Sequence, residues 1–478
     1  MRLKYVRARN FLVLLGSNLA AKGAWFVSIV LLMNYLDPAA FGLLASLWAI
    51  GAVAAGFSDV GVGQVLLRDG AREPGLARSI ARKTLVLQIV LSLILFSIVT
   101  ASALTWLPSP GLDDITRVTV FALSIATMLM DRFSALFTVF SQLSGDYRRI
   151  SLYRSVYFLC LLGSFTVAMD AQVGLDGVAQ LYFVWTVVFT CLMAWVTWRV
   201  LPYSTQTTNE SMLSLARQGF WFLGNTGLSI AYGRIEVVLL GLFGFMVLAG
   251  AYHVAYQIVL LFFSISGIFF TVIYARLYAH QGHAMAVRED FVDTLRWLSI
   301  FAWMAAPPMI LYTDQMAQLL GSDALVAHAD TLRVLSLMIC LLPAAAALDF
   351  LPTLELAKQR VYAEASGLGL TLVLTIILLV LDAPEAISWA ALVGYIWAVG
   401  LAYRFAASKR VLMLADLLHE TWRVAWPALI ALVLVLSLPW SWWQISLVYS
   451  LLFLLLLFFT RHPAATKMMD TLRAALRH

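Results

Sequence analysis

Residues 34–72 read NYLDPAAFGLLASLWAIGAVAAGFSDVGVGQVLLRDGAR, and they enclose an apolar run between two polar boundaries. Asp37 and Pro38 precede the run, and an aspartate, two glycines and a basic segment follow it. The hydrocarbon core of a bilayer is about 30 Å thick, so a helix that crosses it needs about 20 apolar residues. The run from 41 to 62 has this length and predicts a membrane-spanning helix.

The glycines at the end of this stretch raise the alternative of a phosphate-binding loop. Gly61 and Gly63 lack the third glycine of the G-x-G-x-x-G pattern, and they follow a predicted helix where that pattern needs a strand. We therefore interpret them as the inner end of the helix, followed by a basic surface segment that reaches Arg72.

Similar apolar runs recur along the whole chain. Of its 478 residues 62% are hydrophobic and only 12% are charged, and the mean hydropathy is +0.87. Soluble domains are about half apolar and about one quarter charged. The sequence therefore predicts an all-α polytopic membrane protein with about 14 transmembrane helices. The predicted spans are 11–36, 41–62, 83–107, 116–140, 151–169, 177–198, 213–243, 248–273, 291–313, 331–352, 361–381, 386–405, 422–438 and 442–459.

The distribution of basic residues tests this topology independently. Alternate segments, beginning with the N-terminus, hold 27 of the 32 Lys and Arg residues. The opposite loops hold only Arg117 and Arg333 together with many acids. Because Lys and Arg remain on the cytoplasmic side of short loops, both termini are predicted to be cytoplasmic. The net charge of +6 follows from this topology, so no nucleic-acid partner is predicted.

An internal repeat is the next feature. A shift of 208 residues pairs Arg9 with Arg217 and Gly42 with Gly250 without a gap. Six helices per repeat is an even number, so the halves have the same orientation, as in many transporters. The predicted domains are a six-helix lobe over 1–208, a second six-helix lobe over 209–416, and 417–478, with helices 13 and 14 and a cytoplasmic amphipathic tail from 461 to 478.

The opening stretch also resembles the Wzx-type flippases, the polysaccharide-transport branch of the MATE/MOP superfamily. Those proteins show Y-L-G-P-x-x-F-G-x-Y before their second helix and D-L-G-L-G-x-A-L-V-R after it. Residues 234–258, RIEVVLLGLFGFMVLAGAYHVAYQI, resemble the corresponding pattern in the second half of that family. Three positions depart from the family: Asp37 replaces a glycine, Leu44 a tyrosine, and Glu236 an acid that is more often aspartate.

The resemblance implies a function. It implies a transporter, not an enzyme, that flips an undecaprenyl-diphosphate-linked oligosaccharide repeat unit from the cytoplasmic to the periplasmic leaflet of the bacterial inner membrane. The product would feed O-antigen, exopolysaccharide or capsule synthesis, by alternating access of two lobes coupled to a cation. The implied partners are the lipid-linked oligosaccharide, membrane lipids, and a polysaccharide polymerase with its export machinery. No cofactor is implied.

Charges inside apolar helices are the candidate site residues, because each costs at least about 2.5 kcal/mol at a helix centre. The predicted substrate-binding residues are Lys22, Arg234, Arg132 and Asn18, and the predicted coupling-ion residues are Glu236 and His253. Asp59 and Asp349, near inner helix ends, are assigned to gating or structure. Each of these residues also has a purely structural interpretation, as an ion pair or a packed side chain. The three cysteines lie inside predicted helices, which argues against a zinc site or a disulfide framework.

Arg234 and Glu236 pose a geometric condition. Two steps of about 100° place them on nearly opposite faces of a regular helix. They can face one cavity only if Gly233 breaks the helix locally.

Three other functions compete. A MATE-type drug antiporter shares the fold class, but its cationic substrates need little positive lining. A membrane polymerase or ligase of lipid-linked glycans usually carries catalytic residues on a long outer loop, and the predicted outer connections 108–115 and 314–330 are short. A scramblase or structural subunit fits the buried charges less well.

Overall fold

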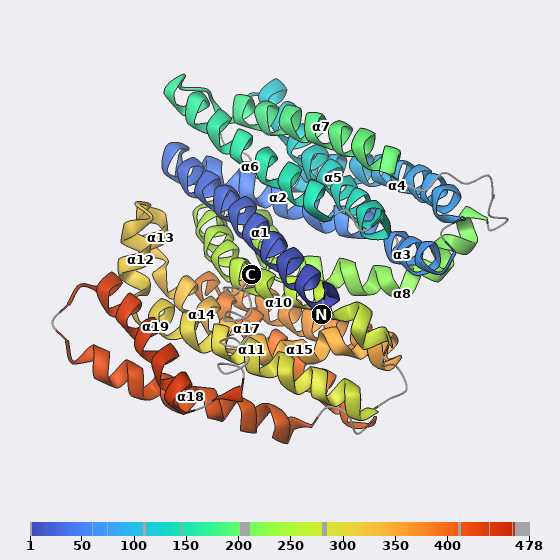
Figure 1. Cartoon of the computed structure of the whole chain (residues 1–478). Helices are drawn as coiled ribbons and strands as arrows, with labels where there is room; N and C mark the ends of the chain where they lie inside the picture. Colours follow the sequence, from blue (N-terminus) through green and yellow to red (C-terminus); the bar gives the residue numbers. More distant parts are fainter. Residues whose placement is uncertain are drawn as a thin grey trace. The chain divides into compact units, whose positions relative to one another are not determined.

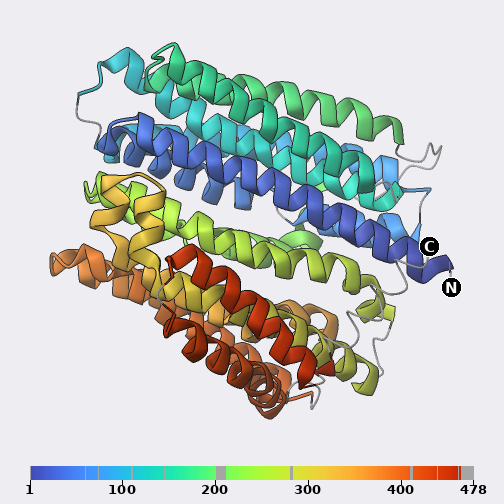
Figure 2. The ribbon, with the colours of Figure 1, turned by 60° about the vertical axis from the view of Figure 1, so that its left-hand side comes forward.

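The computed structural model of the chain describes residues 2–59, 61–73, 75–108, 111–144, 147–200, 211–279, 284–409, 413–438, 440–460 and 462–463. Over these residues the chain is helical and contains no strand (Figures 1 and 2). The helices are α1 (Arg2–Tyr35), α2 (Pro38–Ser58), α3 (Val62–Arg72), α4 (Ala77–Trp106), α5 (Asp114–Ser144), α6 (Tyr147–Asp170), α7 (Leu175–Val200), α8 (Met212–Ala231), α9 (Ile235–Leu242), α10 (Met246–Ala279), α11 (Ala284–Leu311), α12 (Thr313–Leu319), α13 (Asp323–Ala327), α14 (Ala329–Cys340), α15 (Leu342–Phe350), α16 (Ala357–Val380), α17 (Ile387–Ala407), α18 (Leu414–Leu436) and α19 (Trp442–Phe459), with 3₁₀ helices η1 (Leu351–Leu354) and η2 (Pro384–Ala386).

Each predicted span coincides with a helix or with a pair of consecutive helices. Ten described helices are long and apolar enough to cross a membrane, and an eleventh is formed if α14 and its continuation through α15 and η1, bent by 56°, make one span. The predicted all-α polytopic class is therefore confirmed. The windows on α1, α8–α9 and α11 are helical but fall outside this set, so the total of 14 spans stays a prediction.

The start of α2 follows from its sequence. Pro38 occupies the first helical turn, where its missing N–H is not needed. The carboxylate of Asp37 accepts hydrogen bonds from the backbone N–H of Ala39 at 3.0 Å and of Ala40 at 3.4 Å. Asp37, which departs from the family pattern, is thus an N-cap that satisfies two donors of the first turn.

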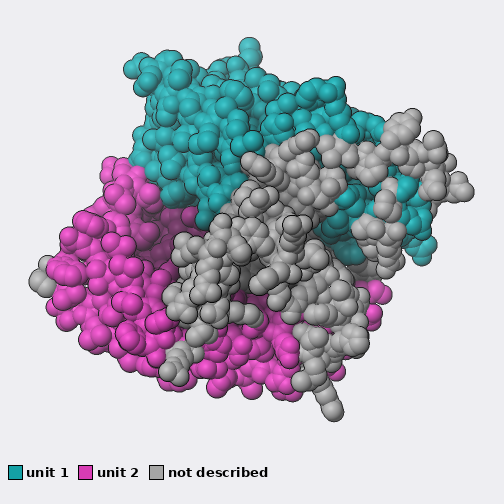
Figure 3. Space-filling view, viewed as in Figure 1, with its two compact units in different colours: residues 1–257, 368–391 teal, residues 258–367, 392–478 magenta. Residues whose placement is uncertain are grey.

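The chain divides into two compact units, coloured separately in Figure 3. Unit 1 comprises Met1–Gln257 and Leu368–Ala391, and unit 2 comprises Ile258–Gly367 and Leu392–His478. Three helices, α10, α16 and α17, cross from one unit to the other along the sequence. The division at 208 and 416 inferred from the internal repeat stays a prediction.

In unit 1, α1 packs along α6 in a parallel register. The hydroxyl of Ser155 donates to the carbonyl of Ser17 at 3.0 Å, and the hydroxyl of Tyr35 donates to the carbonyl of Val173 at 2.9 Å. Both bonds join positions 138 residues apart, so the two helices keep one register over most of α1. This register decides which side chains of α6 come close to those in the middle of α1.

In unit 2, α11 is the central helix and packs against α14, α15 and α18. Phe291 stacks edge-to-face with Phe350, which in turn meets Phe270, in a buried apolar cluster. The pair α18–α19 packs against α11 through a second apolar cluster that includes Val424 and Tyr449. Apolar packing thus joins these two C-terminal helices to the body of unit 2.

Candidate functional site

The helix predicted over 213–243 is broken at Gly233. Helix α8 ends at Ala231 and α9 begins at Ile235, and Gly233 between them has a φ of +69°. A Cβ atom at this position would lie 1.8 Å from the ring of Tyr256 in α10. Only glycine satisfies both the left-handed backbone and this close approach. The helix is therefore broken at Gly233, but the break precedes both Arg234 and Glu236, and Arg234 keeps right-handed helical dihedrals at the start of α9. That the two side chains face one cavity stays a prediction.

Arg234 and Glu236 both lie at the start of α9, directly after the break. Arg234 is the N-cap residue of α9, and its Nη1 donates to the carbonyl of Ile230 at 3.1 Å. Glu236 lies in the first turn of α9 and is fully buried. No described side chain donates a hydrogen bond to the carboxylate of Glu236, and the backbone N–H groups of Gly233 and of Glu236 itself act on it. An acid in this state requires a ligand, a proton or water.

Two tyrosines of α10 lie within electrostatic reach of Glu236. The charge of Glu236 acts on both Tyr252 and Tyr256. The Tyr252 hydroxyl is buried and, within the described residues, has no hydrogen-bond partner. The carboxylate of Glu236 can accept a hydrogen bond from a small polar ligand, and the hydroxyl of Tyr252 can donate one.

Lys22 lies among positive charges. The charges of Arg154 in α6 and Arg234 both act on Lys22, and the α1–α6 register brings Arg154 to the side of α1. No described residue forms an ion pair or a hydrogen bond with Lys22. The negative charge of Asp131 in α5 acts on the guanidinium of Arg234. We call Lys22, Arg154 and Arg234 the cation cluster. Because Arg154 and Arg234 each repel Lys22, an anion or water beside Lys22 would stabilise it.

Asp59 and Arg132 form an ion pair with each other. The Oδ2 atom of Asp59 accepts from Nη2 of Arg132 at 3.0 Å, and its Oδ1 accepts from the backbone N–H of Gly63 at 3.2 Å. Asp59 therefore joins the start of α3 to α5. Arg132, a predicted substrate ligand, differs from Lys22 because a carboxylate already holds it.

The turn at Asp59 is itself tightly packed. Gly61 has a φ of +67°, and a Cβ atom there would lie 2.2 Å from the carbonyl oxygen of Gly219 in α8. The glycine that the sequence places at the inner end of α2 therefore allows two backbones to meet.

His253 joins an aromatic cluster that sequence reasoning missed. Its imidazole is buried, with Nε2 at 3.3 Å from Nε2 of Gln257 and the ring centroid 6.1 Å from that of Trp48. Trp25, Trp48 and Tyr182, from α1, α2 and α7, lie with centroids 5.3–5.5 Å apart. One feature of the sequence could have indicated this cluster. Trp25 follows Lys22 by three residues and therefore lies on the same face of the helix.

The remaining predicted residues lie elsewhere. Asp349 belongs to unit 2, where it pairs with Arg360 at 3.1 Å, and Arg360 also bonds to Glu364 at 3.1 Å. The side chain of Asn18 lies outside the described residues, and so does the predicted amphipathic tail apart from residues 462–463. The structure therefore brings together Lys22, Arg234, Glu236 and His253 in unit 1 and does not describe Asn18 with them.

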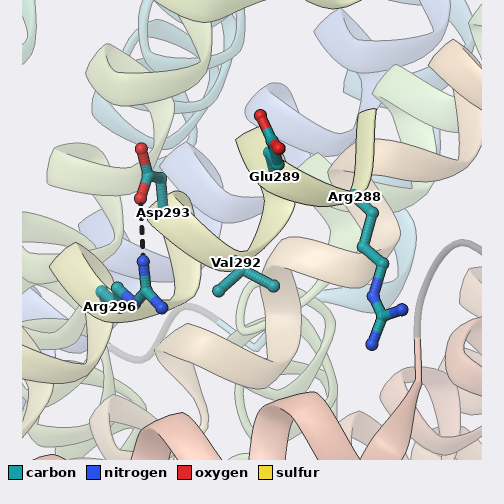
Figure 4. Close-up of a pocket in the computed structure, with 5 residues that line it drawn as sticks. All are labelled: Arg288, Glu289, Val292, Asp293 and Arg296. Carbon is teal, nitrogen blue, oxygen red and sulfur yellow. Dashed lines mark hydrogen bonds and ion pairs between the residues drawn. The ribbon is translucent and has the colours of Figure 1, made fainter. Parts of the chain in front are cut away.

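A pocket of about 370 Å³ opens at the start of α11 in unit 2 (Figure 4). None of the predicted site residues lines it. Its two arginines are already paired: Arg288 with Asp416 at 2.9 Å, and Arg296 with Glu420 at 3.0 Å. In Figure 4 the guanidinium of Arg296 reaches Asp293, at 3.1 Å, on the same helix. This pocket offers a ligand little free charge, so we place the candidate site in unit 1.

Comparison with known proteins gives a family match. The model of the family described as "Polysaccharide biosynthesis protein" matches residues 7–277. A search of curated proteins finds no significant match.

Solved structures of transporters share the fold. The structure of the lipid II flippase MurJ in an inward closed conformation aligns at 11% identity, with a TM-score of 0.67, over 94% of this chain and 99% of that chain. The MATE multidrug transporter DinF-BH aligns at 14% identity and a TM-score of 0.65, over 84% and 95%. An inward-facing multidrug resistance MATE family transporter of the MOP superfamily aligns at 16% identity and a TM-score of 0.58, over 82% and 96%. The predicted resemblance to this superfamily is confirmed at the level of fold.

Proposed function

Because this chain belongs to the polysaccharide biosynthesis protein family, we propose that it flips an undecaprenyl-diphosphate-linked oligosaccharide repeat unit from the cytoplasmic to the periplasmic leaflet. The chain is a multi-pass membrane transporter of this family. The proposal adds the cargo, the direction, alternating access, and a location in the bacterial inner membrane with both termini in the cytoplasm. It also adds delivery to a polysaccharide polymerase and export machinery.

The cation cluster is the observation that carries this proposal. A diphosphate headgroup is the part of such a lipid that hydrocarbon rejects most strongly. Guanidinium groups bind phosphate oxygens in pairs, and a lysine ammonium adds a point charge. Arg154 and Arg234 each repel Lys22, and an anionic substrate would relieve that repulsion.

The buried acid supports coupling to a cation. Glu236 has no side-chain partner among the described residues, so a proton or a sodium ion that binds to it neutralises a buried charge that no ion pair balances. Tyr252 supplies a hydroxyl in the same neighbourhood, and His253 lies in the adjoining turn of α10. We assign Glu236 as the coupling residue, with His253 assisting.

The drug antiporter is the second candidate, since MATE transporters share the fold. Its substrates are usually cations, and a cluster of three positive side chains would repel them. The cluster therefore favours the lipid-linked anion over a cationic drug.

The decisive experiment uses a deletion strain that lacks this protein. Loss of the flippase should cause lipid-linked repeat units to accumulate on the cytoplasmic leaflet, and the wild-type chain should reverse that accumulation and restore the surface polysaccharide. A strain in which the repeat units are distributed normally, and in which the chain restores only drug resistance, would contradict the proposal and support the antiporter.

A further inference from the structure

The outward face of α7 ends in a cation that lies on an indole ring. The exposed apolar residues of this face are separated by three or four positions, and they are Val184, Val188, Leu192 and Trp195. Arg199, in the last turn of α7, is exposed, and its Cζ atom lies 4.1 Å from the centroid of the Trp195 ring. Because α7 is among the candidate membrane spans, this apolar face contacts lipid and Arg199 lies just beyond it.

Helix α4 begins with a similar arrangement. Arg82 is exposed, and it stands four positions before Val86, where an exposed apolar face begins that continues through Leu93. Helix α4 is also among the candidate membrane spans. Since a helix rises 1.5 Å per residue, Arg82 and Arg199 each lie about 6 Å beyond the apolar face of their own helix.

A second contact between a cation and a ring joins these two helix ends. The Cζ atom of Arg78 in α4 lies 5.6 Å from the centroid of the Trp198 ring in α7. Trp198 in turn makes a T-shaped contact with the buried ring of Phe140 in α5, with the centroids 6.2 Å apart. The start of α4 and the end of α7 are therefore held at one level within unit 1. We call Arg78, Arg82, Trp195, Trp198 and Arg199 the interfacial patch.

The two exposed arginines of this patch retain hydrogen-bond donors. Within the described part of the chain, neither Arg82 nor Arg199 forms an ion pair or a hydrogen bond. The contact with Trp195 uses the flat face of the Arg199 guanidinium, whereas the N–H donors lie in the plane of that group and stay available. The ring also restricts the long side chain, which lowers the entropy that a ligand must remove on binding.

Membrane topology alone does not account for these contacts. Basic residues gather at the same end of alternate spans, so an isolated cation at such a helix end is expected. Arg404, exposed in the last turn of α17, is an example, and it makes no ring contact with a described residue. The interfacial patch differs because two of its cations lie on indole rings, directly beside lipid-facing surfaces.

We propose that the interfacial patch binds the headgroup of an anionic phospholipid. Tryptophan prefers the level at which headgroups meet hydrocarbon, and arginine binds phosphate oxygens through paired N–H donors. Arg82 and Arg199 contact the phosphate, and the acyl chains lie along the outward faces of α4 and α7. The members of the patch carry positive charge and no negative charge, so a lipid with a net negative charge is favoured over a zwitterionic one.

The proposed orientation of the chain places this lipid in the cytoplasmic leaflet. Only the choice of leaflet rests on that orientation. Lipid binding itself depends on the patch and not on what the protein transports, so its test is separate from the test of the proposed function.

Lipid binding to the full-length protein in detergent tests the charge preference. The protein is titrated with dioleoylphosphatidylglycerol and, separately, with dioleoylphosphatidylcholine, whose headgroup is zwitterionic. Native mass spectrometry gives the dissociation constant of the first bound lipid. We expect phosphatidylglycerol to bind at least about tenfold more tightly, because only this lipid leaves the phosphate charge unbalanced. Equal affinity for the two lipids would overturn the proposal.

A double variant locates the site. Arg82→Gln with Arg199→Gln removes both exposed charges and should weaken phosphatidylglycerol binding at least about tenfold. The matched control is Arg404→Gln with Lys409→Gln, which removes two exposed cations at the end of α17 and should change the affinity less than about twofold. The proposal is wrong if the double variant loses no more affinity than this control.

A third variant addresses the ring contact. Trp195→Leu keeps an apolar side chain toward the lipid but removes the ring on which Arg199 lies, and it should weaken phosphatidylglycerol binding about threefold. Because Trp195 is exposed, the unfolding temperature should stay at the wild-type value, which shows that the variant folds. Wild-type affinity in Trp195→Leu would contradict the assignment of the lipid to this patch.

Discussion

The two units differ in whether all of their candidate charges are paired. In unit 2, Arg296 pairs with Glu420 across α11 and α18, and Arg360 pairs with Asp349 and Glu364. In unit 1, Asp59 pairs with Arg132, but Lys22 and Glu236 have no ion-pair partner among the described residues. A buried charge with a purely structural role needs an oppositely charged partner, because an unpaired buried charge destabilises the fold. A charge left without a partner is free to bind a ligand, and the comparison therefore separates structural charges from candidate functional ones.

Charge reversal of Lys22 should have the largest effect. Lys22→Glu replaces an attraction for the diphosphate by a repulsion and should reduce flipping to the background level. Loss of a single charge-assisted bond is worth about 1.5–3 kcal/mol, which already exceeds a tenfold change in binding. Flipping of lipid-linked repeat units into reconstituted vesicles is the measurement.

Two controls make this result specific. Lys22→Arg keeps the positive charge and should retain much of the transport. Membrane abundance of Lys22→Glu should equal that of the wild type, since no structural partner is lost. Normal export by Lys22→Glu would remove the cation cluster from the mechanism.

Breaking a pair in unit 2 should act on stability instead. Arg296→Ala leaves the carboxylate of Glu420 buried without its bidentate partner, whose two bonds are both 3.0 Å. We expect the free energy of unfolding to fall by about 3 kcal/mol. Unfolding of the detergent-solubilised protein measures this change.

The double variant Arg296→Met with Glu420→Leu is the control for that experiment. It removes both charges at similar volume and should recover most of the lost stability. If the single variant proves as stable as the wild type, the pairs of unit 2 are not structural and the contrast between the units fails.

Local patterns in the sequence predicted much of the fold. Apolar runs and basic loops depend on neighbouring residues, so every predicted span coincides with a helix or with consecutive helices. The sequence also indicated where a break would be needed. Arg234 and Glu236 stand two positions apart, so they could face one cavity only if the helix broke at Gly233. Family membership followed from two motifs, and the match over 7–277 confirms it.

Long-range pairing could not be predicted in this way. Arg132 pairs with Asp59, 73 residues away, while its sequence neighbour Asp131 acts on Arg234. The aromatic cluster and the approach of Arg154 to Lys22 depend on how α1, α2, α6 and α7 pack together. A single sequence records the residue types of such contacts but not their partners.

Gly233→Ala tests whether the break is needed. The substitution forces an L side chain into φ +69° and against the ring of Tyr256, and a strained backbone of this kind costs about 1–3 kcal/mol. We expect a lower unfolding temperature and reduced transport, because the break sets the position of the start of α9 and with it Arg234 and Glu236. Gly163→Ala, where a Cβ atom meets nothing within 4 Å, should leave both unchanged. A fully active Gly233→Ala would show that the geometry of the break does not matter.

Asp113 is an exposed carboxylate, in contrast to the buried charges compared above. Its substitution should have the smallest effect on stability. It lies in unit 1 just before α5, is exposed, and accepts a hydrogen bond from the backbone N–H of Thr116 at 3.2 Å. The hydrogen bonds from Thr116 lower the pKa of the Asp113 carboxyl below its usual value. A depressed carboxyl pKa stabilises the folded chain above about pH 4, and that contribution is lost as the pH falls through the folded-state pKa. Asp113→Asn keeps an acceptor for the helix start and should remove only this acid dependence, seen as a small change of unfolding temperature below about pH 4. If the wild type and Asp113→Asn lose stability in parallel on acidification, the acid sensitivity arises from other groups, and the paired carboxylates of unit 2 are the next to test.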